Sequence, residues 1–170
     1  MLKAAGCILI FIGCCTAGFI KAASYRDRRA ELESVLELVR ILNMEICYRK
    51  DSLKKIFERI SSEKDCWFSS HLAECGRQLE NQLSLSEAWS ISLDKTKEFC
   101  PLLEKDKEIL RDISMGLGRS DTGGQKKIFE AALLRLERNR AEAGEQEARQ
   151  GKMYKGLGIA AGAAAAIILI

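Results

Sequence analysis

Proline, histidine and aromatic residues are scarce in this sequence of 170 residues, which has one proline, one histidine and 6% aromatic residues. One proline excludes a proline-rich linker and, with 30% charged residues, favours helices over a sheet or a disordered tail. One histidine excludes, within this chain, any metal site that needs two. The sequence has no internal repeat and no low-complexity linker, so a single soluble part is the simplest organisation.

A large excess of one sign of charge is also lacking. The chain has 27 basic and 24 acidic residues, a net charge of +3. This excess is too small to indicate nucleic-acid binding unless it is concentrated in one place. Basic residues concentrate only beside two apolar segments at the ends of the chain. We therefore expect no nucleic-acid partner, and a lipid bilayer as one partner.

The first apolar segment covers residues 4–20, which carry no charge and lie between Lys3 and Lys21. Its length meets the lower bound of about 17 residues for a membrane helix, and both lysines can reach the interfaces. We predict an N-terminal transmembrane helix at residues 1–23. A cleaved secretory signal is the alternative, and Phe11–Cys14 approximates a lipoprotein cleavage box. The long apolar run and the phenylalanine at the first box position argue against cleavage.

The second apolar segment, residues 156–170, is also free of charge. At a rise of about 1.5 Å per residue it is shorter than a hydrocarbon core of about 30 Å. Met153 and Tyr154 lengthen it, and a tyrosine ring suits the membrane interface. We predict a C-terminal transmembrane helix at residues 153–170.

Small residues recur on one face of this second segment. Gly158 and Gly162 form a G-x-x-x-G pattern that Ala166 extends, and such a face lets another helix approach closely. We predict transmembrane packing through these three residues, either by self-association or by docking on the first span, where Gly13 and Ala17 could supply the matching surface. An alanine-rich helix without specific packing is the alternative.

Basic residues flank both segments on their inner sides and predict the orientation. They are Lys21, Arg26, Arg28 and Arg29 after the first segment, and Arg149, Lys152 and Lys155 before the second. Because basic flanks stay on the cytoplasmic side, residues 21–155 are expected in the cytosol. Cytosolic thiols are normally reduced, so the seven cysteines need not pair. For Cys14 and Cys15, helix packing is favoured over palmitoylation or metal binding.

The cytosolic part shows helical periodicity throughout. Apolar residues from Leu32 to Ile46 recur every three or four positions, and the chain has no clear break between Ile20 and Tyr48, although a bend near Ser24 is an alternative. Further helices are predicted after Ser52, from Asp65 to Asn81, from Ser86 to Phe99, from Leu102 to Met115 and from Thr122 onward. Ser84 or Ser86 can cap the third of these. Pro101 can lie in the first turn of the fourth.

These patterns predict an all-α fold, with a cytosolic bundle of five or six helices between the two transmembrane helices. The predicted parts are residues 1–23, the bundle at 24–136, a charged helical arm at 137–152 and residues 153–170. The arm has eight charged residues among the sixteen from 137 to 152, so we expect it to be exposed to solvent and mobile.

Reactive residues do not form a recognisable catalytic or metal motif. His71 and Cys75 could share a helix face, with Cys66 nearby, but a zinc site needs three or four ligands. A thiol hydrolase would also need an orienting group and an oxyanion site. The glycine-rich stretch 116–124 lacks the lysine followed by serine or threonine of a phosphate-binding loop, so we interpret it as an interhelical turn. We predict no catalytic residue, cofactor or metal, and therefore no enzyme.

Glu45 lies within an apolar run, where a partly buried carboxylate needs a basic or hydrogen-bonding partner. Tyr48, one helical turn later, is one candidate partner. The alternative is that Glu45 reaches solvent at the edge of the apolar stripe.

Three stretches resemble the stage III sporulation protein AB family. The first is Leu42-Asn-Met-Glu-Ile-Cys-Tyr48 with Leu53, where Asp51-Ser52 replaces the Thr-Pro usual in the family. The second and most specific is Leu117-Gly-Arg-Ser-Asp121 with Gln125, followed by Leu136-Glu137. The third is Gly151-Lys-Met-Tyr-Lys-Gly-Leu-Gly158, which leads into the terminal apolar segment.

This resemblance implies a membrane-anchored scaffold of the channel complex that joins mother cell and forespore during sporulation. It implies a role in spore development and a place in the mother-cell-derived membrane around the forespore. The family's cytosolic bundle resembles the inner-membrane platform proteins of type II secretion and type IV pilus machines. By that analogy we expect two kinds of partner, a cytosolic secretion-type ATPase and other membrane subunits of the channel.

Candidate residues for an interface, or for holding the helices in register, are Glu45, Tyr48, Ser120, Asp121 and Gln125. Two other functions stay open on the sequence alone. The chain could be an anchored adaptor of a different envelope secretion or pilus machine, or a membrane hydrolase that uses Cys75 or His71.

Overall fold

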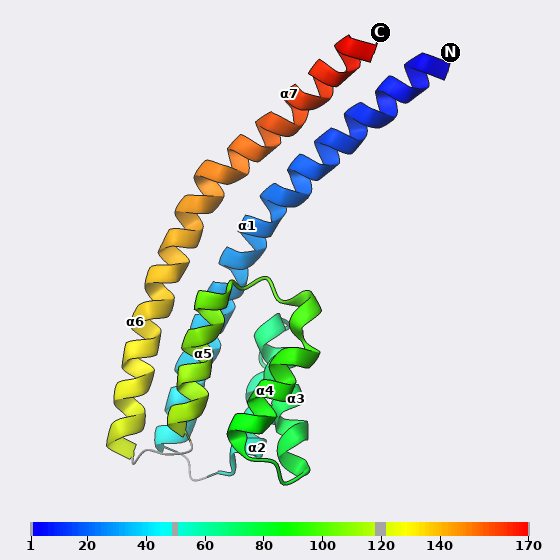
Figure 1. Ribbon diagram of the computed structural model, residues 1–170. Helices are drawn as coiled ribbons and strands as arrows, with labels where there is room; N and C mark the ends of the chain where they lie inside the picture. The colour runs from blue at the N-terminus through cyan, green and yellow to red at the C-terminus, as the bar shows by residue number, and fades with distance from the viewer. Residues whose placement is uncertain (1, 49–50, 118–121, 170) are drawn as a thin grey trace. The chain divides into compact units, whose positions relative to one another are not determined.

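Every element of the chain is helical in the computed structural model, which describes residues 2–48, 51–117 and 122–169 (Figure 1). The all-α prediction is therefore confirmed for these residues. In chain order the elements are α1 (Leu2–Tyr48), α2 (Leu53–Ser61), α3 (Trp67–Glu80), α4 (Leu85–Lys95), η1 (Lys97–Phe99), α5 (Glu104–Leu117), α6 (Thr122–Gln146), the π-helical turn η2 (Glu147–Gly151) and α7 (Lys152–Leu169).

The chain folds as two compact units. The first contains Met1–Arg29 and Ala141–Ile170, and the second contains Ala30–Arg140. Helix α1 runs without a break through Ser24, whose hydroxyl donates to the Lys21 carbonyl oxygen at 2.8 Å. Such a bond within a helix satisfies the hydroxyl without ending the helix. The alternative of a bend at Ser24 is not observed.

The core of the second unit forms around the apolar stripe that the sequence predicts on α1. Leu32, Val35, Val39 and Leu42 are fully buried. The indole of Trp89 on α4 packs edge-on against Phe57 of α2 and Phe68 of α3, with ring centroids 6.2 and 6.3 Å apart. Fully burying each such side chain contributes about 1.5–3 kcal/mol, so this cluster holds α2, α3 and α4 together.

Side-chain capping is present at the start of α4 and absent at the start of α2. Ser84 caps α4, because its hydroxyl accepts the Glu87 amide at 3.3 Å while the Glu87 carboxylate accepts the Ser84 amide at 3.1 Å. This is the reciprocal capping box, and it confirms Ser84 as the cap. Ser52 is the N-cap of α2, but its side chain makes no capping hydrogen bond.

The start of α5 differs from the prediction. Pro101 lies before the helix, which begins at Glu104. The buried carboxylate of Asp106 accepts the Leu103 amide at 3.0 Å and the Asn139 side-chain amide at 2.8 Å. Asp106 thus caps α5 from inside its first turn and ties α5 to α6, which fixes the start after the proline.

The charged arm predicted at residues 137–152 is helical, and one side of it packs on α1. Ala143 and Gly151 are buried, and Arg28 and Arg29 of α1 bond Gln146 and Glu147 at 2.9 and 3.1 Å. The other side of the segment is exposed, with eight of the sixteen residues from 137 to 152 exposed, so the arm is exposed on one side only. Its mobility stays a prediction.

Candidate functional site

The first unit is a pair of antiparallel helices, in which the N-terminal part of α1 lies beside α7 (Figure 1). The helices approach each other most closely at two glycines. A Cβ atom added at Gly18 would lie 2.7 Å from the Tyr154 carbonyl oxygen, and one added at Gly158 would lie 2.9 Å from the Cys14 carbonyl oxygen. These obstacles are backbone atoms, so only glycine permits this spacing.

Gly158 and Gly162, two of the three predicted packing residues, therefore lie on the face that meets α1. A Cβ atom at Gly162 would lie 2.9 Å from the Phe11 ring. The side chain of Ala166 is outside the described part. The suggestion of Gly13 and Ala17 as the matching surface is wrong, because Gly13 borders open space and Ala17 is exposed.

The outward faces of this helix pair are apolar. Leu9, Ile20 and Ile167 are each more than 70% exposed, and Ile8 is 60% exposed. In this pair, small residues lie at the contact between the helices and large apolar residues face outward. A water-soluble helix pair has the opposite arrangement, whereas this one is typical of helices that pack within lipid. Among the described helices, α1 is long and apolar enough in its N-terminal part to cross a membrane, by length and composition.

Aromatic and basic side chains mark the polar end of the pair. Tyr25 and Tyr154 stack with ring centroids 5.9 Å apart. Lys21 lies 5.7 Å from the Tyr25 ring centroid, and Lys155 lies 5.9 Å from that of Phe19. Aromatic rings beside lysines are characteristic of the level where apolar helices leave a bilayer.

In the second unit, the buried carboxylate of Glu31 caps the N-terminus of α3. The Glu31 side chain on α1 accepts the amides of Trp67 at 3.2 Å and Phe68 at 2.9 Å. Burial raises the pKa of Glu31 above its ordinary value, although these two hydrogen bonds act in the opposite direction. The α3 start at Trp67, rather than the predicted Asp65, follows from this remote cap.

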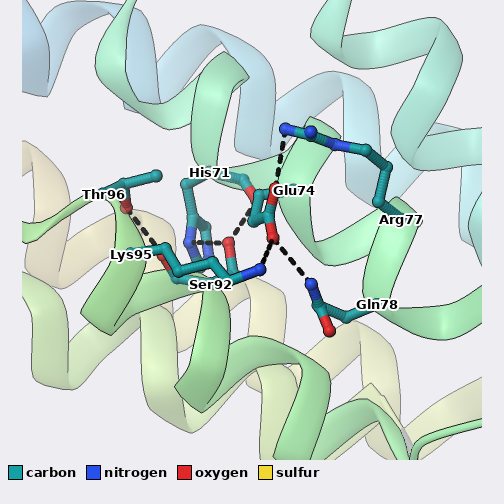
Figure 2. Close-up of polar contacts among 7 residues, drawn as sticks. All are labelled: His71, Glu74, Arg77, Gln78, Ser92, Lys95 and Thr96. Carbon is teal, nitrogen blue, oxygen red and sulfur yellow. Dashed lines mark hydrogen bonds and ion pairs between the residues drawn. The ribbon is translucent and has the colours of Figure 1, made fainter. Parts of the chain in front are cut away.

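Polar contacts join α3 to α4 (Figure 2). The Ser92 hydroxyl donates to the His71 carbonyl oxygen at 2.6 Å, so the 2.8 Å contact with His71 Nδ1 places the ring proton on that nitrogen. Glu74 accepts Lys95 Nζ at 2.7 Å and Arg77 at 2.6 Å. The Lys95 hydrogen bond, followed by those from its other partners, lowers the pKa of Glu74.

The same environment argues against His71 and Cys75 as catalytic groups. Burial lowers the pKa of His71 to about 3 and raises that of the Cys75 thiol to about 12. At neutral pH both are uncharged and enclosed by the core, so the pair has neither a thiolate nor access to a substrate. The described residues contain no group of three or more His, Cys, Asp or Glu placed to hold a metal.

Two of the five candidate interface residues contact other parts of the bundle. Glu45, with 16% of its side chain exposed, forms an ion pair with Arg59 of α2, and Arg59 also lies 3.5 Å from Asp51. Gln125 donates to the Leu117 carbonyl oxygen at 3.3 Å and so links the start of α6 to the end of α5. Ser120, Asp121 and the Tyr48 side chain are outside the described residues, so their roles stay predictions.

Two large apolar side chains are exposed between the end of η1 and the start of α5. Phe99 is 83% exposed and Leu103 is 47% exposed. Phe99 borders a hollow of about 390 Å³ whose wall includes Trp67 and Lys95. Helical periodicity predicted Phe99 inside a regular helix, whereas α4 ends at Lys95 and Phe99 is the last residue of η1, so this exposure was not predicted.

The family is decided by comparison with known proteins. The model of the stage III sporulation protein AB family matches residues 3–170. The chain belongs to the stage III sporulation protein AB family. The family protein of Bacillus subtilis (strain 168) is 28% identical over 171 residues, which covers 100% of both chains.

A solved structure of a stage III sporulation protein AB has a similar fold. Its TM-score is 0.67 at 24% sequence identity, and the match covers 71% of this chain and 96% of that one. At this identity the likeness shows the fold alone. The resemblance inferred from the three sequence stretches is therefore confirmed at the level of the family, and this chain is a sporulation protein.

Three important residues were missed or misassigned from the sequence. Gly18 follows Cys14 and Phe11 at helical spacing, but other small residues of α1 give similar patterns, so this spacing did not identify the contact face. Arg59 was not identified as a partner of Glu45, although the two form an ion pair, and the Tyr48 side chain lies outside the described residues. Glu31 had no local signal, because its partners lie 36 and 37 residues later in the chain.

Proposed function

We propose that this chain is a membrane-anchored scaffold of the channel complex between mother cell and forespore. In this proposal both terminal helices cross the mother-cell-derived membrane, and the bundle lies in the cytosol. The main support is the glycine contact between α1 and α7, because backbone packing of small residues under an apolar outer surface suits helices in lipid. Membership of a sporulation family gives the cellular setting.

Contacts within the helix pair also favour retention of the first apolar segment. Phe11 packs on Gly162, and the Cys14 backbone packs on Gly158. A cleaved signal or lipoprotein leader would remove Phe11 and leave the small-residue face of α7 without its partner. When the first segment is retained, the packing face of α1 stays in contact with the small-residue face of α7.

We propose further that the bundle binds a cytosolic secretion-type ATPase through the surface around Phe99 and Leu103. Phenylalanine is enriched at protein interfaces, and the polar residues that line the hollow beside Phe99 suit an interface rim. Glu45 and Gln125 instead support the bundle, since both bond neighbouring helices. Charge reversal at Glu45 would therefore disturb folding and would be a poor test of an interface.

The test is binding of the purified cognate ATPase to the full chain in lipid nanodiscs, measured by biolayer interferometry. Phe99→Ser is expected to weaken binding by at least about tenfold, in the range of an interface hot spot. The matched control is Leu134→Ser, another exposed apolar residue of the second unit, at 63% exposure, which should bind like the parent. No binding by a folded parent chain would contradict ATPase docking and leave a scaffold whose partners meet its membrane helices.

A further inference from the structure

The first unit contains a groove of about 520 Å³ between α1 and the segment from α6 to α7. Four cationic side chains line it, two from each side, and they face a single carboxylate. The cations are Arg26 and Arg29 of α1 with Lys152 and Lys155 of α7, and the carboxylate is Glu147.

The two arginines have carboxylate neighbours, whereas the two lysines do not. Arg29 pairs with Glu147 at 3.1 Å, and Arg26 pairs with Asp27 at 3.3 Å. Within the described part of the chain, neither Lys152 nor Lys155 has a carboxylate within ion-pair distance. Lys155 instead lies over the Phe19 ring. The groove therefore carries positive charge that the protein itself does not neutralise.

The groove is open because its wall has very short side chains. Gly144, Ala148 and Gly151 line it, and a Cβ atom added at Gly151 would meet nothing within 4 Å. The π-helical turn Glu147–Gly151 lies in the same stretch. Glycines within a helix and π-helical turns both weaken a helix, and π-helical turns often mark functional positions. The short side chains of this stretch therefore leave room for the groove and also make the helix less stable there.

The groove lies where the first charge-free segment ends and the second begins. Phe19 belongs to the run 4–20, and Lys155 directly precedes the run 156–170. If both runs are in lipid, as the proposed function holds, the four cations stand at the depth of the cytoplasmic head groups. A basic pocket between membrane helices on that side suits an anionic head group.

We propose that this groove binds the head group of an anionic phospholipid from the cytoplasmic leaflet. The phosphate pairs with Lys152 and Lys155, and the acyl chains lie along the exposed apolar faces of α1 and α7. Phe19, which lines the groove and is 50% exposed, provides apolar surface beside the cations. A soluble phosphate would use the cations and leave this surface uncovered, so the combination favours a lipid.

The test uses the full chain in detergent, with bound lipid counted by native mass spectrometry after addition of phosphatidylglycerol or phosphatidylcholine. The parent should retain phosphatidylglycerol in preference to phosphatidylcholine. The double variant Lys152→Gln/Lys155→Gln should bind phosphatidylglycerol at least about tenfold more weakly, because each juxtamembrane cation contributes to anionic lipid binding.

The matched control is Lys21→Gln/Arg149→Gln. It removes the same charge beside the same two apolar segments, but neither residue lines the groove. It should retain phosphatidylglycerol like the parent. Equal losses in the two double variants would overturn the proposal in favour of general surface attraction. Displacement of the lipid by millimolar inorganic phosphate would overturn it in favour of a soluble anion.

Flotation of the parent chain with vesicles separates this inference from the proposed function, on which it rests. A chain that fails to float contradicts the membrane anchor itself. A chain that floats but retains both lipids equally contradicts only the lipid site.

Discussion

Replacing Gly158 with leucine is expected to separate α7 from α1 at their apolar ends. The Cβ atom alone would lie 2.9 Å from the Cys14 carbonyl oxygen and 3.2 Å from the Gly18 Cα atom. Backbone atoms cannot rotate away as a side chain can, so we expect a cost of about 3 kcal/mol, the upper part of the range for overpacking. Pulsed electron paramagnetic resonance between spin labels at Ile8 and Ile167, exposed residues near the apolar ends, in a cysteine-free chain in nanodiscs, measures the separation.

Gly156→Leu is the matched control, because it makes the same change two residues earlier, where a Cβ atom meets nothing within 4 Å. The parent and Gly156→Leu should give one narrow distance distribution, and Gly158→Leu a broader and longer one. The same distribution in all three chains would contradict the glycine contact.

Replacing Glu31 with alanine is expected to destabilise the second unit by about 3 kcal/mol, because it leaves two buried amides at the start of α3 without an acceptor. Those amides belong to Trp67 and Phe68. Urea unfolding followed by tryptophan fluorescence measures the loss. Glu33→Ala, two residues later at an exposed position, is the control and should change stability far less.

The pH dependence gives a second measure of Glu31. Burial raises its folded-state pKa, so its protonation favours the folded state. That contribution is fully present below the unfolded pKa, near 4.5, and is lost as the pH rises through the raised folded pKa. The stability advantage of the parent over Glu31→Gln should therefore shrink from pH 4 upward. An advantage that grows over this range would contradict a raised pKa.

Much of the fold could be predicted because its signals are local. The apolar stripe on α1, the Ser84 cap and the end of α3 near Asn81 all depend on residues within a few positions of each other. The glycine pattern at Gly158 and Gly162 was visible for the same reason.

The remaining features depend on contacts between distant residues. Glu31 determines where α3 begins from 36 residues away, and Asp106 reaches Asn139 across α5 and α6. The partner face of α1 could not be chosen from the sequence, because several small residues on α1 give similar patterns and only the contact itself distinguishes Gly18 from Gly13. The groove likewise requires the two helices to be placed beside each other.

The topology of the chain tests the central claim most directly, namely that both terminal helices cross the membrane with the bundle on the cytoplasmic side. Alkaline phosphatase, which is active only outside the cytosol, is fused after Ile170 in one chain and after Glu80 in a truncated one, in a bacterial host. The account predicts an active enzyme after Ile170 and an inactive one after Glu80. An inactive enzyme at both positions, with both fusions intact and membrane-bound, would show that the C-terminal helix does not cross and would contradict the two-helix anchor.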